Sequence, residues 1–192
     1  SIKRLNKPGQ PPLDVIIVEI GGTIGDIEGL PFLEAIRQFR NDIGKENVLY
    51  IHVSFFPYIK SAKEIKSKPT QHSIKELRSI GIQPDLLICR AQARLTVSVK
   101  DKISLFCDIP KEGIIEAEDV SSIYEMPIIL EEQGLGDLII KMLRLPEQKP
   151  DLQEWRKMVY RLYHPDRRVN IAVIGKYIKS KDAYMSINEA LV

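Results

Sequence analysis

Two short stretches of the sequence concentrate the residue types that bind phosphates and metal ions. The first is EIGGTIGDIEG, Glu19 to Gly29, which has four glycines and three acids in eleven residues. Glycine tolerates positive φ, so its backbone N–H groups can turn toward an anion. Carboxylates beside such groups need a cation such as Mg²⁺ between themselves and a phosphate. We therefore expect Glu19, with Asp26 or Glu28, to serve a metal–nucleotide site; the alternative is a tight turn with solvated or helix-capping acids.

The second stretch is KEIKSKPTQHS, residues 63–73, in which two lysines stand next to a predicted helix start. In an extended loop, Lys66 and Lys68 would point the same way because they are two residues apart. Pro69 would stiffen this loop, and Thr70 would cap the next helix. Two ammonium groups beside a helix N-terminus favour an anion site. The alternative is a solvated basic face.

Other chemistry-bearing residues give weaker signals or none. Lys100 and Lys102 begin a predicted helix and raise the positive potential there. The sequence contains no GxxxxGK[ST], GxGxxG or GxSxG motif and no zinc-type Cys/His cluster. His52 lies in an apolar run and is predicted to be a core or crevice residue. Cys89 and Cys107 have apolar neighbours, which predicts buried, reduced thiols and a cytoplasmic location.

Strand-like and helix-like stretches alternate along the chain and would position these residues. The predicted strands are residues 14–20, 48–56, 85–91 and 113–119, and the predicted helices are residues 31–43, 70–79, 99–106 and 128–143. This order is typical of an α/β fold with an open, mostly parallel sheet and flanking helices. Ligands bind beyond the carboxyl ends of such strands. Glu19, at the end of the first predicted strand, would then overhang the binding crevice.

The composition changes near residue 145, where prolines and polar residues become frequent. A predicted helix at 151–164 follows, and then an apolar strand at 169–175 that would open another α/β unit. We therefore expect three parts: residues 1–143, an interdomain linker at 144–168, and the start of a second domain at 169–192. Because the chain opens at Ser1 without a Met, we expect it to be a piece of a longer protein.

The overall composition excludes several classes of partner. The chain is 44% hydrophobic and 28% charged, which is ordinary for a globular protein. A net charge of +2 is too small to indicate binding to nucleic acid or to an anionic membrane surface. No apolar run approaches the roughly 18 residues of a membrane span.

Four blocks of the sequence resemble the CTP synthase family in order and spacing. They are EIGGTIGDIEGLPFLEAIRQ, KSKPTQHSIKELRSIGIQPDLLICR, VKDKISLFC and EDVSSIYEMPIILEEQGL. The resemblance implies the C-terminal part of a synthetase (amidoligase) domain with a P-loop, dethiobiotin-synthetase-like core whose N-terminal part is missing. The tail from residue 169 is similar to the start of a class I glutamine amidotransferase domain.

The resemblance also implies an activity. The family makes CTP from UTP by phosphorylating the uracil 4-oxygen with ATP and displacing the phosphate with ammonia. The ammonia comes from glutamine through the second domain. CTP acts as a feedback inhibitor, and the active form is a homotetramer. The implied cofactor is Mg²⁺, with ATP as a co-substrate.

Individual residues acquire roles from the same resemblance. Glu19 would be a ligand of Mg²⁺ on the ATP phosphates, and Lys68 would steady charge on the transferring phosphoryl group. The residues implied to contact ATP are Glu118, Asp119 and Val120. Those implied to contact UTP or the inhibitor CTP are Asp26, Ile27, Glu28, Lys66, Ser67, Lys68, Pro69, Thr70, Gln71 and Lys102.

The chain also departs from the family pattern. The family's phosphate loop and a second metal-binding aspartate would lie before Ser1, and its glutaminase cysteine, histidine and glutamate would lie after Val192. We therefore expect the 192 residues alone to be inactive. Two alternatives remain: a non-catalytic nucleotide-binding or oligomerising fragment, and a related ATP-dependent ligase of the same fold, such as a dethiobiotin synthetase.

Overall fold

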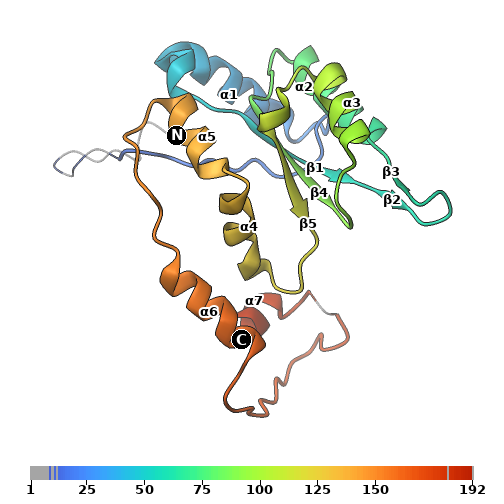
Figure 1. Ribbon diagram of the computed structural model, residues 1–192, viewed down its shortest axis with the longest axis vertical. Coiled ribbons are helices and arrows are strands. Elements are labelled where there is room, and N and C mark those ends of the chain that lie inside the picture. Colours follow the sequence, from blue (N-terminus) through green and yellow to red (C-terminus); the bar gives the residue numbers. More distant parts are fainter. Residues whose placement is uncertain (1–8, 10, 12, 181, 192) are drawn as a thin grey trace.

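A three-stranded parallel sheet forms the centre of the protein (Figure 1). The structure is a computed structural model that describes residues 9, 11, 13–180 and 182–191. The strands are β1 (Ile51–Phe56), β4 (Leu86–Ala91) and β5 (Ile114–Glu118), in the order β1-β4-β5. Because all three run in the same direction, their carboxyl ends meet at one edge of the sheet.

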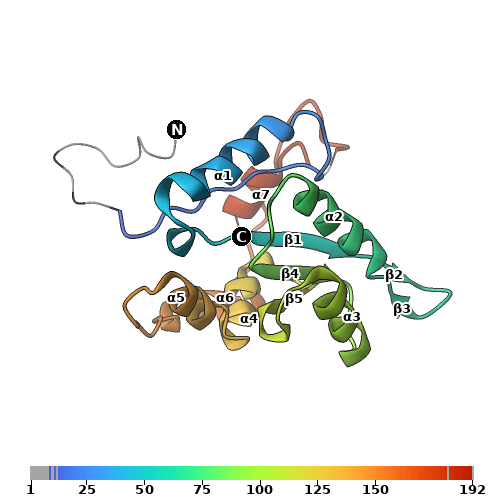
Figure 2. The same cartoon turned by 90° about the horizontal axis from the view of Figure 1, so that it is seen from above.

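Helices cover both faces of the sheet, as Figure 2 shows from above. Helices α2 (Lys68–Ser79) and α3 (Val97–Cys107) pack on one face, and α4 (Met126–Glu132) and α5 (Leu135–Leu143) pack on the other. Strand β4 supplies both cores because successive side chains point to opposite faces. Its Leu87, Cys89 and Ala91 contact the α2–α3 side, and its Leu86 and Ile88 contact the α5 side. The predicted α/β class, with a parallel sheet and flanking helices, is confirmed.

Helix α1 (Leu30–Ile43) precedes the sheet in the chain and packs beside α2. Pro31 lies in its first turn, where a missing N–H costs no hydrogen bond. The helix ends at Gly44, whose φ of 93° favours glycine. Leu33 is buried with Leu77 and Ile82, which ties α1 to the C-terminal part of α2. The short 3-10 helix η2 (Lys45–Asn47) then leads to β1.

A small antiparallel hairpin separates β1 from α2 and projects from the body in Figure 1. It consists of β2 (Tyr58–Ile59) and β3 (Glu64–Ile65). Lys63, in the turn, has a φ of 49°. The Lys66 N–H donates to the Pro57 carbonyl at 3.0 Å, which fixes the chain just before α2.

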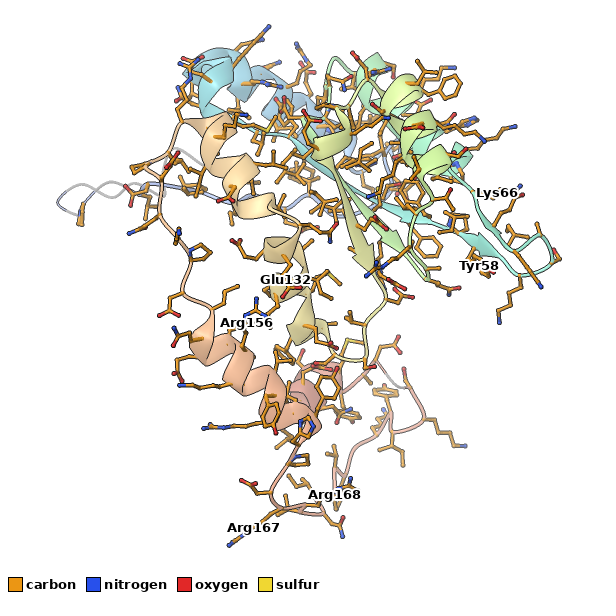
Figure 3. The ribbon with its side chains drawn as sticks, in the orientation of Figure 1. Tyr58, Lys66, Glu132, Arg156, Arg167 and Arg168 are labelled. Carbon is orange, nitrogen blue, oxygen red and sulfur yellow. The ribbon has the colours of Figure 1, made fainter. Side chains whose placement is uncertain are left out.

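Helix α6 (Gln153–Tyr163) contacts the last residue of α4 and the residues just before α4. The Trp155 indole N–H donates to the Tyr124 carbonyl at 2.7 Å, and Arg156 and Glu132, labelled in Figure 3, form an ion pair at 3.0 Å. The Tyr163 hydroxyl also bonds to the carboxylate of Glu125. The remaining elements are η3 (Lys111–Gly113), η4 (Ile123–Glu125) and α7 (Met185–Ala190).

Two predicted strands do not form. Residues 14–20 and 169–175 have no strand structure, and apolar side chains in both stay in solvent: Ile17 is 92% exposed and Ile174 is 95% exposed. A strand requires a neighbour to pair its backbone groups. In the described part of the chain, the parallel sheet ends at β1 and β5, and neither segment pairs with these strands. Apolar composition was therefore not enough to predict strand pairing.

The predicted helix at 128–143 is two helices. Gly134, between α4 and α5, has φ 78° and ψ 21°, a left-handed conformation that ends the first helix. The other predicted helices of residues 1–143 form with boundaries shifted by one to two residues. The prediction of buried, unpaired thiols at Cys89 and Cys107 is confirmed. No helix among the described residues is both long and apolar enough to cross a membrane.

Candidate functional site

The glycine-rich stretch forms a small pocket of about 310 Å³ before α1. All three acids of the stretch contribute to its wall. The lining residues are Glu19, Ile20, Gly21, Gly22, Asp26, Glu28, Gly29 and Phe32. The three acids therefore share one pocket with Gly21, Gly22 and Gly29, and the metal–nucleotide site expected there stays a prediction.

A compact turn shapes this pocket. Gly22 and Gly25 have φ values of 95° and 103°, which side-chain-bearing residues rarely adopt. The Thr23 N–H donates to the Asp26 carboxylate at 3.1 Å, and the Asp26 N–H donates back to the Thr23 carbonyl at 3.1 Å. Ile24 packs against the α1–α2 core. One apolar side chain thus anchors the turn while its acids stay in solvent.

The oxygen donors of the pocket suit a hard cation. A Cβ added at Gly21 would lie 3.3 Å from Glu19 Oε1, and one added at Gly22 would lie 3.8 Å from Asp26 Oδ2, so both carboxylates lie close to the glycine backbone. Mg²⁺ is bound by one or two carboxylates together with substrate phosphates. No group of three His, Cys, Asp or Glu residues that could hold a metal occurs in the described ranges. An ion held by these two carboxylates would need its remaining ligands from phosphates and water.

The lysine stretch forms the start of α2, two residues earlier than expected. Ser67 is the N-cap residue and Lys68 is the first residue of the helix, followed by Pro69. The Gln71 side-chain amide donates to Ser67 Oγ at 3.1 Å. Lys68 therefore projects from a helical turn near the positive end of the helix dipole. The predicted extended spacing of Lys66 and Lys68 does not hold.

Thr70 is not the helix cap that was predicted. Its side chain is fully buried, and its Oγ1 lies 2.8 Å from Ser54 Oγ on β1. A second link lies one turn further along α2, where His52 Nε2 and Ser73 Oγ are 3.0 Å apart. Burial lowers the pKa of His52. These two links hold the N-terminal half of α2, and with it Lys68, against the sheet.

A carboxylate pairs with one of the predicted anion-binding lysines. Lys66 Nζ forms an ion pair with Glu64 of β3. The hydrogen bond from Lys66 lowers the pKa of Glu64 most, and the charges of Lys66 and Lys102 lower it further. Sequence analysis missed Glu64, although its position two residues before Lys66 in an extended segment was a usable signal. Figure 3 labels Lys66 and Tyr58 on this side of the molecule.

The predicted ATP-contacting residues lie at the carboxyl end of β5. The Asp119 N–H donates to the Ala91 carbonyl at 2.8 Å, so the ends of β4 and β5 stay together. Arg90 lies 3.8 Å from the Asp119 carboxylate, and Arg94 lies 3.7 Å from that of Glu118. Sequence analysis missed both arginines; their signal was their position at and just beyond the end of a buried strand.

The predicted site residues thus form three groups. Glu19, Asp26 and Glu28 share the pocket; Lys66 pairs with Glu64; Glu118 and Asp119 each face an arginine. The pocket lining contains no lysine. The structure therefore brings residues together within each group, and the predicted convergence of Glu19 and Lys68 on shared phosphates stays a prediction.

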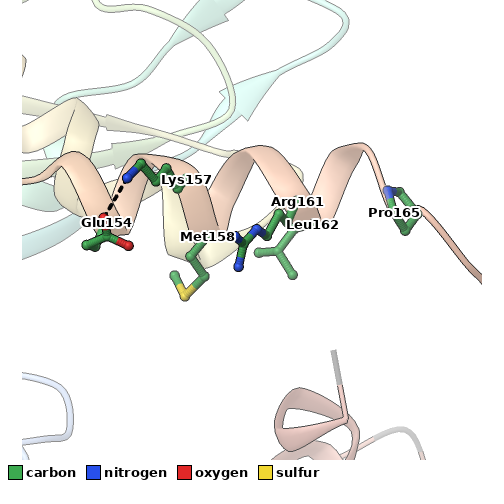
Figure 4. Close-up of a pocket in the computed structure, with 6 residues that line it drawn as sticks. All are labelled: Glu154, Lys157, Met158, Arg161, Leu162 and Pro165. Atoms are coloured by element: carbon green, nitrogen blue, oxygen red, sulfur yellow. Dashed lines mark hydrogen bonds and ion pairs between the residues drawn. The ribbon is translucent and has the colours of Figure 1, made fainter.

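A larger pocket, of about 510 Å³, lies along one side of α6 (Figure 4). It is lined by Glu154, Lys157, Met158, Arg161, Leu162 and Pro165. None of the predicted site residues contributes to it. Size alone therefore does not identify the site, and the carboxyl edge of the sheet remains the better candidate because it gathers the charged residues.

Comparisons with known proteins show which family the chain resembles. Residues 1–145 match the family model described as CTP synthase N-terminus. The CTP synthase of Methanocaldococcus jannaschii is 62% identical over 179 residues, which cover 93% of this chain and 33% of that protein. The CTP synthases of Methanococcus maripaludis and a Synechococcus strain are 57% and 56% identical over 190 residues, which cover 99% of this chain and 35% of each relative. The chain spans about a third of the length of these relatives.

Proposed function

The chain belongs to the CTP synthase family, and we propose that it supplies part of the nucleotide-binding surface of an enzyme that converts UTP to CTP. The observation that carries this proposal is the lysine group at the start of α2. Lys68 opens the helix, and Lys66 precedes it by two residues. Cations at a helix N-terminus bind phosphate groups through both charge and helix dipole.

The proposed reaction has two steps. The γ-phosphoryl group of ATP moves to the 4-oxygen of UTP, releasing ADP; ammonia then attacks C4, and phosphate leaves. Phosphoryl transfer is catalysed mainly by positioning and charge stabilisation. We assign Lys68 to the charge on the transferring group, and Lys66 and Lys102 to the UTP triphosphate. The backbone and side chains of Ser67, Pro69, Thr70 and Gln71 would shape this subsite.

The other two groups would bind the remaining ligands. Glu19 would hold Mg²⁺, which supplies charge neutralisation on the ATP phosphates when it is bound. Asp26, Ile27 and Glu28 would border the inhibitor CTP, and their exposure leaves them accessible to it. The residues that would border ATP are Glu118, Asp119 and Val120. Glutamine as nitrogen donor and a homotetrameric assembly belong to the same proposal.

Binding of CTP and UTP tests the site. Calorimetry in the presence of Mg²⁺ would compare the 192-residue chain with K66A/K68A. Charged hydrogen bonds contribute about 1.5–3 kcal/mol each, so we expect the double variant to lose at least about tenfold in affinity. K75A/K141A removes two exposed lysines from other positions and is the charge-matched control. Equal binding by K66A/K68A and the control would reject the lysine site.

A second experiment concerns turnover. The 192 residues contain no GxxxxGK[ST] phosphate loop, and we propose that they do not make CTP alone. The chain would be mixed with UTP, ATP, Mg²⁺ and ammonia, and CTP would be quantified by chromatography. Nucleotide binding without turnover is the expected result. CTP formation above the rate without protein would refute the proposed inactivity.

A further inference from the structure

We infer that Glu64 competes with the triphosphate: its carboxylate pairs with Lys66, which phosphates would otherwise bind, and so weakens phosphate binding. This inference rests on the proposed function of the lysine group. It adds to that group a residue that lowers affinity and so regulates occupancy of the site.

Glu64 begins β3, and Lys66 follows directly after this strand, two residues further along the chain. Glu64 pairs with Ile59 in the β2–β3 register, and the Lys66 N–H donates to the Pro57 carbonyl at 3.0 Å. The Lys66 ammonium group forms its ion pair with the Glu64 carboxylate. Both side chains are about half exposed, at 47% for Lys66 and 52% for Glu64. An incoming anion can therefore reach the pair from solvent.

Lys102 of α3 is the other lysine assigned to the triphosphate. Its positive charge acts on the Glu64 carboxylate together with that of Lys66. The hydrogen bond from Lys66, followed by these charges, lowers the pKa of Glu64. The competing negative charge is thus present at neutral pH, when a triphosphate would bind.

A carboxylate and a phosphate offer ammonium groups the same kind of oxygen acceptor. A triphosphate bound to Lys66 and Lys102 would approach Glu64, and like charges repel. The Glu64 side chain must then turn away, or its charge weakens the binding of the triphosphate by repulsion. An exposed ion pair is weak, so exchange of the carboxylate for phosphate is feasible. If Glu64 instead served to orient Lys66 for the ligand, its removal would weaken binding, so the sign of the effect separates the two roles.

The test is the variant Glu64→Gln, which keeps the shape of the side chain and removes its charge. Calorimetry would measure binding of inorganic tripolyphosphate and, separately, of CTP to the 192-residue chain. Because an exposed ion pair is weak, we expect both ligands to bind only about two- to fivefold more tightly. Glu147→Gln removes one exposed carboxylate from the segment after α5 and should leave both affinities unchanged.

The outcomes separate this inference from the proposed function. Unchanged or weaker tripolyphosphate binding by Glu64→Gln overturns the inference, as does a lack of tripolyphosphate binding by both proteins. If either result is found while the parent chain binds CTP and K66A/K68A does not, the proposed lysine site stands. If tripolyphosphate binds more tightly to Glu64→Gln but CTP binds no better than tripolyphosphate, the inference stands and the pyrimidine assignment fails.

Discussion

Ser54 Oγ lies 2.8 Å from Thr70 Oγ1, and this hydroxyl pair joins β1 to the first turn of α2. Thr70 is fully buried and Ser54 is partly buried. A buried hydroxyl requires a hydrogen-bond partner, or its desolvation remains uncompensated. The pair therefore fixes the part of α2 that carries Lys68, so the fold and the proposed phosphate site depend on the same contact.

The first prediction concerns this pair. Ser54→Ala should lower the free energy of unfolding by about 1–3 kcal/mol because it leaves the buried Thr70 hydroxyl without this partner. Thr70→Val removes the buried hydroxyl itself, so it should cost less. Urea unfolding of both single variants and of S54A/T70V would measure the coupling. A double variant as unstable as the sum of the two singles, within about 0.3–0.5 kcal/mol, would show that the hydroxyls do not interact.

The second prediction concerns pH. Burial lowers the pKa of His52, so the folded protein keeps this imidazole neutral at pH values where the unfolded chain, with a pKa of about 6.5, binds a proton. Uptake of a proton by the unfolded state alone lowers the free energy of unfolding as pH falls, with a limiting slope of about 1.4 kcal/mol per pH unit. The His52 contribution is therefore present above about pH 6.5 and lost below it.

Urea unfolding at several pH values between about 7.5 and 5 would test this, since the unfolded histidine titrates in that range. His52→Gln should flatten the loss of stability on acidification. His72→Gln changes an exposed histidine of the same region and should keep the parent's pH dependence. If the two variants show equal slopes, His52 is not responsible for the pH effect.

The sequence pattern predicted the features that depend on the order of residues along the chain and on their burial. Apolar runs located β1, β4 and β5, because strands of parallel sheets are rich in apolar residues. One face of β1 nevertheless stays exposed, at Ile51, Val53 and Phe55. The acids of residues 19–29 and three of the glycines line one pocket, while the site that was predicted there stays a prediction. The apolar neighbours of Cys89 were enough to predict its burial.

The features that were missed depend on contacts between distant segments. The apolar run at 14–20 resembles a strand, yet strand formation requires a partner that the run itself does not specify. Thr70 has the residue type of a cap, but its contact with Ser54 across 16 positions decides its role. Arg90 reaches Asp119 only because β4 and β5 are neighbours. Local sequence contains none of these pairings.

The third prediction concerns thiol reactivity. Burial raises the pKa of the Cys89 thiol to about 12 and raises that of Cys107 as well. Because the thiolate is the nucleophile, both cysteines should resist iodoacetamide at pH 8 in the folded protein. Mass spectrometry should show little alkylation without denaturant and two adducts per chain in urea. Rapid modification of Cys89 under native conditions would contradict its burial.

The last prediction concerns the break between α4 and α5. Gly134 has a φ of 78°, and no other atom lies within 4 Å of a Cβ built there, so a substitution would meet backbone strain and no steric clash. Gly134→Ala should therefore lower the free energy of unfolding by about 1–2 kcal/mol, the cost of a left-handed conformation for a residue with a Cβ. Gly134→Asn should cost less because asparagine tolerates this conformation. Alanine also restricts the unfolded chain, which alone would stabilise the protein by about 0.4–1 kcal/mol. Urea unfolding would measure the sign of the change in the free energy of unfolding. A more stable Gly134→Ala variant would mean that α4 and α5 can join into the single helix that the sequence suggested.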